Sequence, residues 1–291
     1  MTPYPYPVRF HTLSGGARLA YVEAGSGPET LVLIHGLSSN LLIWRRNLAA
    51  LADQVRVVAI DLPGYGQSPP APLPLSMPYL ASLVMELVFK LGLSRVTLGG
   101  HSMGGQIALT AALRYPQTVR RLVLAAPAGF ERFDPLQAAV LRRSFRPEAI
   151  RRMSAYTLRQ NLRLGFYRYP QEADFIISDR LELGRSEAFS DYLETVGQSI
   201  DAMLQGPVWS RLPDITQPVL VLFGQHDLLI PNRLFKPWGR PQRIAEAGVR
   251  RIPHAILQMV DRCGHFLPFE QAELFSHSVT RFMQVTQGFQ A

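Results

Sequence analysis

The chain is poor in the residues that mark several protein classes. Its 291 residues include one cysteine, Cys263, so an internal disulfide bond is excluded and nothing indicates an oxidising compartment. No run reaches the roughly 18 apolar residues that cross a membrane, and the N-terminus lacks a basic stretch followed by an apolar one. No Cys/His spacing typical of zinc sites occurs. We therefore expect a cytoplasmic protein with no metal, no cofactor and no stable membrane insertion.

Lysine is scarce as well, since Lys90 and Lys236 are the only two, and the net charge of +8 comes from arginine. Arginines are densest between residues 142 and 168, where Glu148 is the only acid. A basic chain can bind nucleic acid, but no nucleic-acid-binding motif accompanies this run and no such partner is expected. Two interpretations stay open: a solvated helix face, or a basic surface that attracts anionic substrates or a membrane surface by long-range electrostatics.

Strand and helix patterns alternate in the first part of the chain and return near its end. Strands are expected at 8–13, 17–24, 31–34, 55–60, 96–98, 119–125, 219–223 and 256–260, and helices at 41–53, 78–91, 103–113 and 270–283. Such alternation predicts a parallel sheet with right-handed crossovers. Residues 130–210 are helical in character and carry no buried-strand pattern. We therefore expect a core domain of 1–129 and 211–291 with a helical insertion of 130–210.

A G-x-S-x-G sequence, Gly100-His101-Ser102-Met103-Gly104, lies between a predicted strand and a predicted helix. A serine exposed at a sharp strand-to-helix turn has a strained backbone, so its neighbours must be small. The helix that follows directs free N–H groups toward negative charge that develops beside the serine. This context favours a nucleophilic serine.

Two further residues with suitable chemistry follow other predicted strands. Asp227 comes after 219–223 and His265 after 256–260, and sites form at the carboxyl ends of parallel strands. We predict that Ser102 is the nucleophile, His265 its base, and Asp227 the acid that orients the imidazole. Asp61 and Asp134, which also follow strands, remain alternative acids.

A tetrahedral oxyanion needs preorganised donors. The candidates are the backbone N–H groups of Leu37, which follows His35-Gly36, and of Met103, at the start of the helix. The expected substrate contacts are Ser38, Phe130, Phe166, Leu228 and Phe266.

The chain resembles the α/β-hydrolase superfamily. The residues that carry the resemblance are His35-Gly36, Asp61-x-Pro-Gly-x-Gly-x-Ser68, Gly100-His101-Ser102-Met103-Gly104-Gly105, Gly224-x-x-Asp227 with Pro231, and Gly264-His265 with Glu270. The resemblance implies a mostly parallel, eight-stranded α/β sheet flanked by helices, with 130–210 as a cap over the active site.

Ser102 lies at the strand-to-helix turn called the nucleophile elbow. A serine at this position fits hydrolysis of a small carboxylic ester, thioester or lactone through an acyl-enzyme. Some other family members use aspartate at the same position. Relatives that hydrolyse a C–C bond of a vinylogous diketone usually have asparagine before the serine and tryptophan after the histidine. This chain has His101 and Phe266 at those positions, so ester hydrolysis is favoured and C–C hydrolysis is the alternative. A non-catalytic receptor or scaffold of the same fold is the alternative of another class. The expected partner is a small-molecule acyl substrate, and a homodimer is left open.

Overall fold

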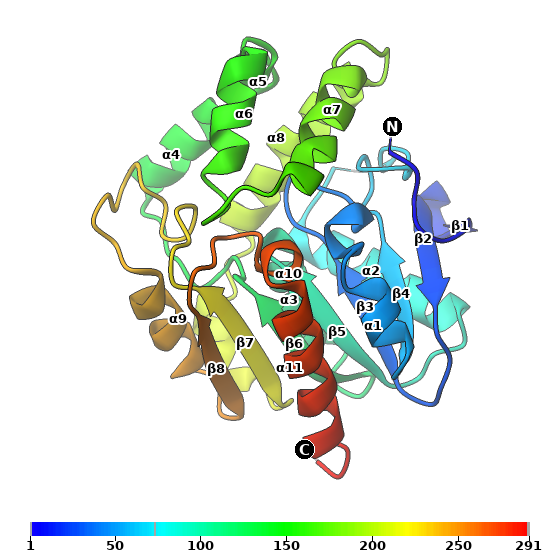
Figure 1. The fold of residues 1–291 in the computed structure, drawn as a ribbon. Helices are drawn as coiled ribbons and strands as arrows, with labels where there is room; N and C mark the ends of the chain where they lie inside the picture. Colours follow the sequence, from blue (N-terminus) through cyan, green and yellow to red (C-terminus); the bar gives the residue numbers. More distant parts are fainter. Residues whose placement is uncertain (1, 73, 290–291) are drawn as a thin grey trace.

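The computed structural model describes residues 2–72 and 74–289, and there eight strands form one sheet between layers of helices (Figure 1). The strands are β1 (Val8–Thr12), β2 (Arg18–Ala24), β3 (Thr30–Ile34), β4 (Arg56–Ile60), β5 (Val96–His101), β6 (Val119–Ala125), β7 (Val219–Gly224) and β8 (Ala255–Val260). Their order is β1-β2-β4-β3-β5-β6-β7-β8. β2 pairs antiparallel with β1 and with β4, and the pairs from β4 to β8 are parallel. The mostly parallel α/β sheet expected from the sequence is therefore confirmed.

The continuous apolar runs of the central strands follow from burial on both faces. In β3, Val32 and Ile34 belong to one hydrophobic cluster, and Leu31 and Leu33 belong to the other. The first cluster packs under α2 (Met77–Lys90), α3 (Met103–Arg114) and α9 (Pro241–Val249), and the second under α1 (Leu48–Ala52) and α11 (Ala272–Val285). Because successive side chains of a strand point to opposite faces, each strand stabilises both layers.

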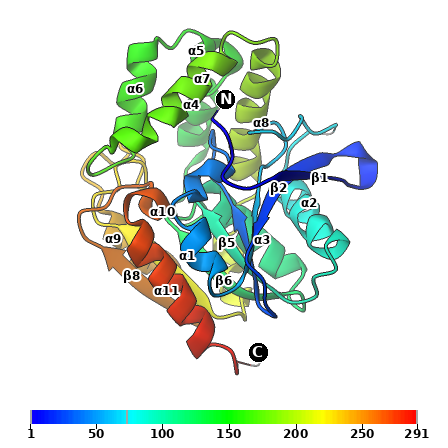
Figure 2. The same ribbon diagram turned by 45° about the vertical axis from the view of Figure 1, so that its right-hand side comes forward.

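Between β6 and β7 the chain leaves the sheet for a group of helices that Figures 1 and 2 both place beyond one end of it. These helices are α4 (Pro135–Ser144), α5 (Pro147–Arg151), α6 (Ala155–Arg163), α7 (Asp174–Leu183) and α8 (Phe189–Gln205). α8 joins the core cluster through Leu193 and Val196, and its Ser199 hydroxyl lies 2.9 Å from the hydroxyl of Tyr65. Within the described residues, no helix has the length and apolar character needed to cross a membrane.

Some elements differ from the sequence predictions. The helix expected over 41–53 is divided into a 3-10 turn at Leu41–Trp44 and the short α1, because Asp61 and Asn40 accept the first N–H groups of the turn. The strand expected at 96–98 continues to His101, so the sharp turn before α3 consists of Ser102 alone. α9 was not predicted, and the closing helix begins earlier, as α10 (Leu267–Glu270), before α11.

Candidate active site

Ser102 forms the sharp turn between β5 and α3. Its φ of 53° and ψ of −117° are strained for a residue with a side chain, and its N–H donates to the carbonyl of Ala125 at 3.0 Å. The glycines on either side allow the close approach of the backbone. A Cβ at Gly104 would lie 2.2 Å from the carbonyl oxygen of Ile34, and one at Gly100 would lie 2.3 Å from that of Gly104. The G-x-S-x-G pattern is therefore a steric requirement of this turn.

His265 and Asp227 meet beyond the ends of β8 and β7. Nδ1 of His265 lies 2.8 Å from Oδ2 of Asp227, and the residues are 4% and 0% exposed. The other carboxylate oxygen, Oδ1, accepts the backbone N–H groups of Leu229 and Ile230 at 2.8 and 2.9 Å. Because the carboxylate is an acceptor, the proton of a neutral imidazole stays on Nδ1 and Nε2 is left as a free base.

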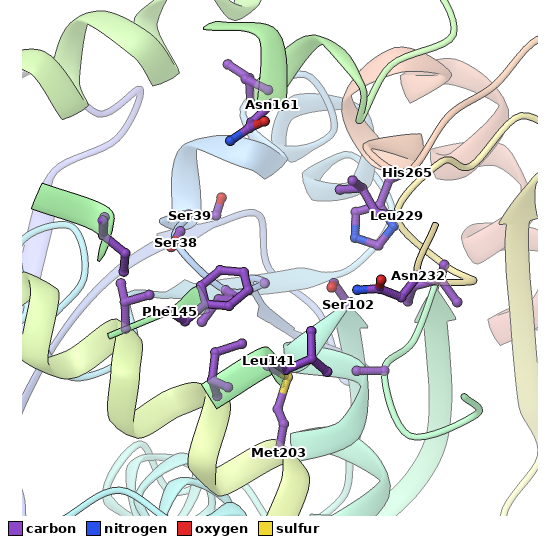
Figure 3. Close-up of a pocket in the computed structure, with 18 of the residues that line it drawn as sticks. Ser38, Ser39, Ser102, Leu141, Phe145, Asn161, Met203, Leu229, Asn232 and His265 are labelled. Carbon is purple, nitrogen blue, oxygen red and sulfur yellow. The ribbon is translucent and has the colours of Figure 1, made fainter. Parts of the chain in front are cut away.

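Ser102 and His265 line the same cavity, although no hydrogen bond joins their side chains. Figure 3 shows both residues facing the open space, with Asn232 reaching into it from the loop after β7 and Asn161 from α6. Catalytic hydrogen bonds are often long before a substrate is bound. The arrangement brings the three residues expected from the sequence to one edge of the sheet.

His101, next to the elbow serine, supports the histidine loop. Its Nε2 lies 3.0 Å from the backbone carbonyl of His265, to which it donates, and its ring packs edge-on against Trp44. Burial and the neighbouring His265 ring lower the pKa of His101 well below 6.5. A neutral His101 therefore fixes the backbone of His265 without adding a charge beside it.

His35 holds the loop that carries the expected oxyanion donors. Its Nε2 accepts the N–H of Leu62 at 2.9 Å, so Nδ1 carries the proton and donates to Gly36 O at 2.7 Å. Burial lowers the pKa of His35 to about 4, so the ring is neutral at pH 7. Within the described residues, the N–H groups of Leu37 and Met103 donate to no other protein group, and both remain available to an anion.

The alternative acids have structural partners instead. Asp61 is buried and accepts hydrogen bonds from Leu41 N, Gln67 N and the hydroxyl of Tyr4. Burial raises its pKa to about 6. Asp134 caps the N-terminus of α4 by accepting the N–H three residues on. Neither carboxylate is bonded to the imidazole described above.

Glu270 forms hydrogen bonds both to the loop that carries His265 and to the helical insertion. One carboxylate oxygen accepts the N–H of Gly264 at 2.8 Å and that of Tyr167 at 3.1 Å, and the other accepts the N–H of Arg168 at 2.7 Å. Glu270 therefore fixes the loop before His265 against residues 167–168.

The cavity has a volume of about 880 Å³ and lies between the strand ends and the insertion. Ser38 and Phe266, two of the expected substrate contacts, line it. Much of the remaining wall is apolar, including Leu141, Phe145, Leu158, Leu162, Ile177, Val196, Ile200 and Met203. Four arginines also line it: Arg132, Arg151, Arg180 and Arg185. In the described part of the chain, no three His, Cys, Asp or Glu side chains are grouped as metal ligands are.

Three expected substrate contacts lie outside the cavity lining. Phe130 is buried against α9, where a Cβ at Gly248 would meet its ring at 2.2 Å. Phe166 is buried behind Phe266, with the two rings stacked at 4.7 Å between centroids. Leu228 is exposed instead. These side chains support the site or face solvent and are not part of the cavity wall, where substrate contacts were expected.

Other lining residues were not foreseen from the sequence, namely Asn161, Arg180, Leu229 and Asn232. The guanidinium of Arg180 donates to the backbone carbonyl of Ser38 and lies over the ring of Tyr192, which places a cation beside the oxyanion loop. No motif marks these positions, because the direction of a side chain in the insertion depends on how its helices pack. The helical spacing of Leu158 and Leu162 is the one signal that the sequence offers.

Comparisons with known proteins agree with this architecture. The model of the alpha/beta hydrolase fold family matches residues 29–272. A 2-hydroxy-6-oxononadienedioate/2-hydroxy-6-oxononatrienedioate hydrolase of Burkholderia vietnamiensis is 31% identical over 284 residues, which cover 92% of this chain and 91% of that protein.

Solved structures give the same result. A probable hydrolytic enzyme from Pseudomonas aeruginosa has a TM-score of 0.87 at 28% identity, covering 97% of this chain and 96% of its own. A thermophilic esterase from Thermogutta terrifontis has a TM-score of 0.76 at 26% identity, covering 96% and 98%. The fold, the match over most of the length and the relative above 30% identity together show that the chain belongs to the α/β-hydrolase fold family.

Proposed function

We propose that the protein is a serine hydrolase that cleaves small carboxylic esters through an acyl-enzyme. Oγ of Ser102 forms a bond to the carbonyl carbon while Nε2 of His265 takes its proton, and Asp227 stabilises the imidazolium. Collapse of the tetrahedral intermediate breaks the bond to the alcohol oxygen, which leaves with the proton from His265. Water, activated by the same imidazole, then releases the acid and restores the serine.

The oxyanion of both intermediates is assigned to the free N–H groups of Leu37 and Met103. The N–H of Met103 opens α3, so the helix dipole adds to the stabilisation of negative charge. Removal of one such donor typically costs about 10² to 10³ in rate. The orientation of the first loop by His35 is therefore part of the proposed mechanism.

The single observation that carries this proposal is the buried contact between Asp227 and His265 at the wall of the cavity that also holds Ser102. The apolar wall favours an apolar acyl or alcohol group, and thioesters or lactones fit the same chemistry. In this proposal residues 130–210 act as a cap, because their helices supply most of that wall.

A second candidate is hydrolysis of a C–C bond next to a carbonyl group in an anionic substrate. The named substrate of the Burkholderia relative is a dioate, which carries two carboxylates, and the arginines of this cavity have the charge to bind such groups. His101 and Phe266, which differ from the residues usual in C–C hydrolases, keep this candidate second.

One experiment separates these functions. The purified protein is assayed with p-nitrophenyl butyrate and with a 2-hydroxy-6-oxo-2,4-dienoate, whose absorbance disappears on cleavage. We expect faster turnover of the ester and a loss of about 10³-fold or more in Ser102→Ala. Ser39→Ala, at another serine of the same cavity, should stay within a few-fold of the wild type.

The other outcomes are equally definite. Faster turnover of the dienoate would establish the second candidate in place of the first. Undiminished activity of Ser102→Ala would refute the nucleophile. Absence of turnover on a wide ester and dienoate panel, with tight binding of a small ligand, would instead indicate a receptor.

A further inference from the structure

Helix α6 and the turn before it lie at the outer end of the insertion. Figures 1 and 2 show α5 and α6 at the end of the molecule opposite α11. Every residue from 151 to 157 is exposed, and no residue of α6 is buried. Most helices of a globular protein bury one face against a core, whereas α6 has no fully buried residue and packs against the core only through the partly buried Leu162.

The two faces of α6 have different surroundings. Ala155, Leu158 and Leu162, spaced by three and four residues, line the cavity. On the other side, Tyr156, Arg159 and Arg163 follow the same spacing and are exposed, Tyr156 by 71%. α6 is therefore a thin wall with the cavity on one side and solvent on the other.

The positive charge of the insertion is concentrated in its first half. Residues 135–170 hold eight arginines and one acid, Glu148, whereas residues 171–205 hold two arginines and eight acids. A uniform preference for arginine would not separate the charges in this way. Of the eight, Arg142 pairs with Asp201, and within the described residues Arg152 and Arg159 make no ion pair. Arg163 lies over the ring of Tyr169. The last three arginines lie beside the exposed side chains of Met153 and Tyr156.

We propose that this outer tip, defined as Arg152, Met153, Tyr156, Arg159 and Arg163, docks on the surface of an anionic phospholipid bilayer. Arginine guanidinium groups bind lipid phosphate and carboxylate groups. Tyrosine and methionine between them enter the boundary between headgroups and acyl chains, as on other interfacial amphipathic helices. An acidic protein or a nucleic acid would also attract the charge, but the exposed apolar side chains favour the bilayer.

The tip also adjoins an opening of the cavity. Met153 and Leu164, at the two ends of α6, are exposed and at the same time line the cavity. The acyl chain of a lipid that enters the cavity at the tip would therefore contact apolar side chains along its path to Ser102. This delivery of a lipid ester rests on the proposed function, whereas docking itself does not.

Vesicle flotation with full-length Ser102→Ala tests docking without turnover. The vesicles contain phosphatidylcholine alone or phosphatidylcholine with phosphatidylserine. We expect binding only to the second kind, weakened by salt. The triple variant Arg152→Gln/Arg159→Gln/Arg163→Gln should bind roughly 100-fold more weakly, about fivefold for each arginine. The single substitution Tyr156→Ser should also weaken binding, measured at a salt concentration where the protein with an unchanged tip still binds.

The matched control removes three exposed arginines at the other end of the molecule, Arg243, Arg250 and Arg281, which lie in or beside α9 and α11. This control should bind within about threefold of the parent, since those residues lie away from the tip. An equal loss of vesicle affinity in the control would overturn the proposal. Equal binding to vesicles with and without phosphatidylserine would overturn it as well. Equally tight binding of a single-stranded oligonucleotide, with no effect of Tyr156→Ser on either ligand, would also overturn it. All these outcomes are independent of esterase activity.

Discussion

Asp227 uses its two carboxylate oxygens for different tasks, with Oδ2 2.8 Å from Nδ1 of His265 and Oδ1 bound to two backbone N–H groups of its own loop. The loop fixes the carboxylate, and the carboxylate fixes the ring. The proposed mechanism depends on this relationship, because it leaves Nε2 of His265 unprotonated toward the cavity.

Asp227→Asn should keep the fold and lose activity. The asparagine oxygen can still accept the loop N–H groups, but its amide donates to Nδ1 and shifts the imidazole proton to Nε2, which can then no longer accept the proton of Ser102. We expect kcat/KM for p-nitrophenyl butyrate to fall by about 10³ to 10⁴, with the circular dichroism spectrum unchanged. A loss below tenfold would remove Asp227 from the mechanism.

Asp61 and His35 should give the stability of the fold opposite dependences on pH. Burial raises the pKa of Asp61 from 3.8 to about 6 and lowers that of His35 from 6.5 to about 4. As the pH falls from 7 to 5, His35 binds a proton in the unfolded chain but stays neutral in the folded protein, and this difference lowers the free energy of unfolding. The folded protein takes up a proton at Asp61 that the unfolded chain does not, which offsets part of the loss.

Asp61→Asn lacks this offset. The free energy of unfolding of the variant should therefore drop by about 1 kcal/mol more than that of the wild type between pH 7 and pH 5. Urea unfolding at the two pH values measures the difference. An equal or smaller drop in the variant would show that Asp61 does not take up a proton in this range.

Gly104→Ala should destabilise the elbow, because the new methyl group would lie 2.2 Å from the backbone carbonyl of Ile34. Neither backbone can move without disturbing the sheet, so we expect a loss of about 2–4 kcal/mol. Gly197→Ala in α8 is the control, since its nearest neighbour would be 3.5 Å away. There alanine should be neutral or stabilise the helix by up to about 1 kcal/mol. Equal unfolding midpoints for the two variants would argue against a steric requirement at the elbow.

Glu270→Gln should loosen the histidine loop. The carboxylate accepts three backbone N–H groups with two oxygens. The amide cannot accept all three, and because two of these contacts are exposed to solvent the loss should be about 0.5–1.5 kcal/mol. We expect a lower melting temperature and a roughly tenfold lower kcat. Glu273→Gln, an exposed change in the first turn of α11, should alter neither. If both variants behave alike, Glu270 has no positioning role.

The strands and their ends could be predicted from the sequence because burial on both faces leaves a readable pattern. Residues 31–34 and 219–223 are apolar throughout, so their ends, and the polar residues that follow them, were visible. Asp227 and His265 were predicted as site residues from their place after such strands, and Ser102 from the G-x-S-x-G sequence between a strand and a helix. Helix α9 was missed because it is only nine residues long and begins at a proline, Pro241. The turn at Leu41–Trp44 depends on the hydrogen bond that Leu41 N–H donates to Asp61, twenty residues away.

The wall of the cavity could not be predicted to the same degree. Phe130 and Phe166 are aromatic residues near the site, yet helix packing directs them into the core, while Arg180 reaches the oxyanion loop from α7. Such directions arise from contacts between distant segments, which local spacing does not encode. The sequence therefore supports a proposal for the reaction type more strongly than a proposal for the substrate.

The nucleophilic role of Ser102 can be read from its covalent state after reaction with a fluorophosphonate, determined by mass spectrometry of the digested protein. We expect one adduct, on the peptide that contains Ser102, formed in step with the loss of esterase activity and absent in Ser102→Ala. Asp227→Asn should form it far more slowly. Full activity without an adduct, or an adduct on another residue that accounts for the loss, would show that Ser102 is not the nucleophile.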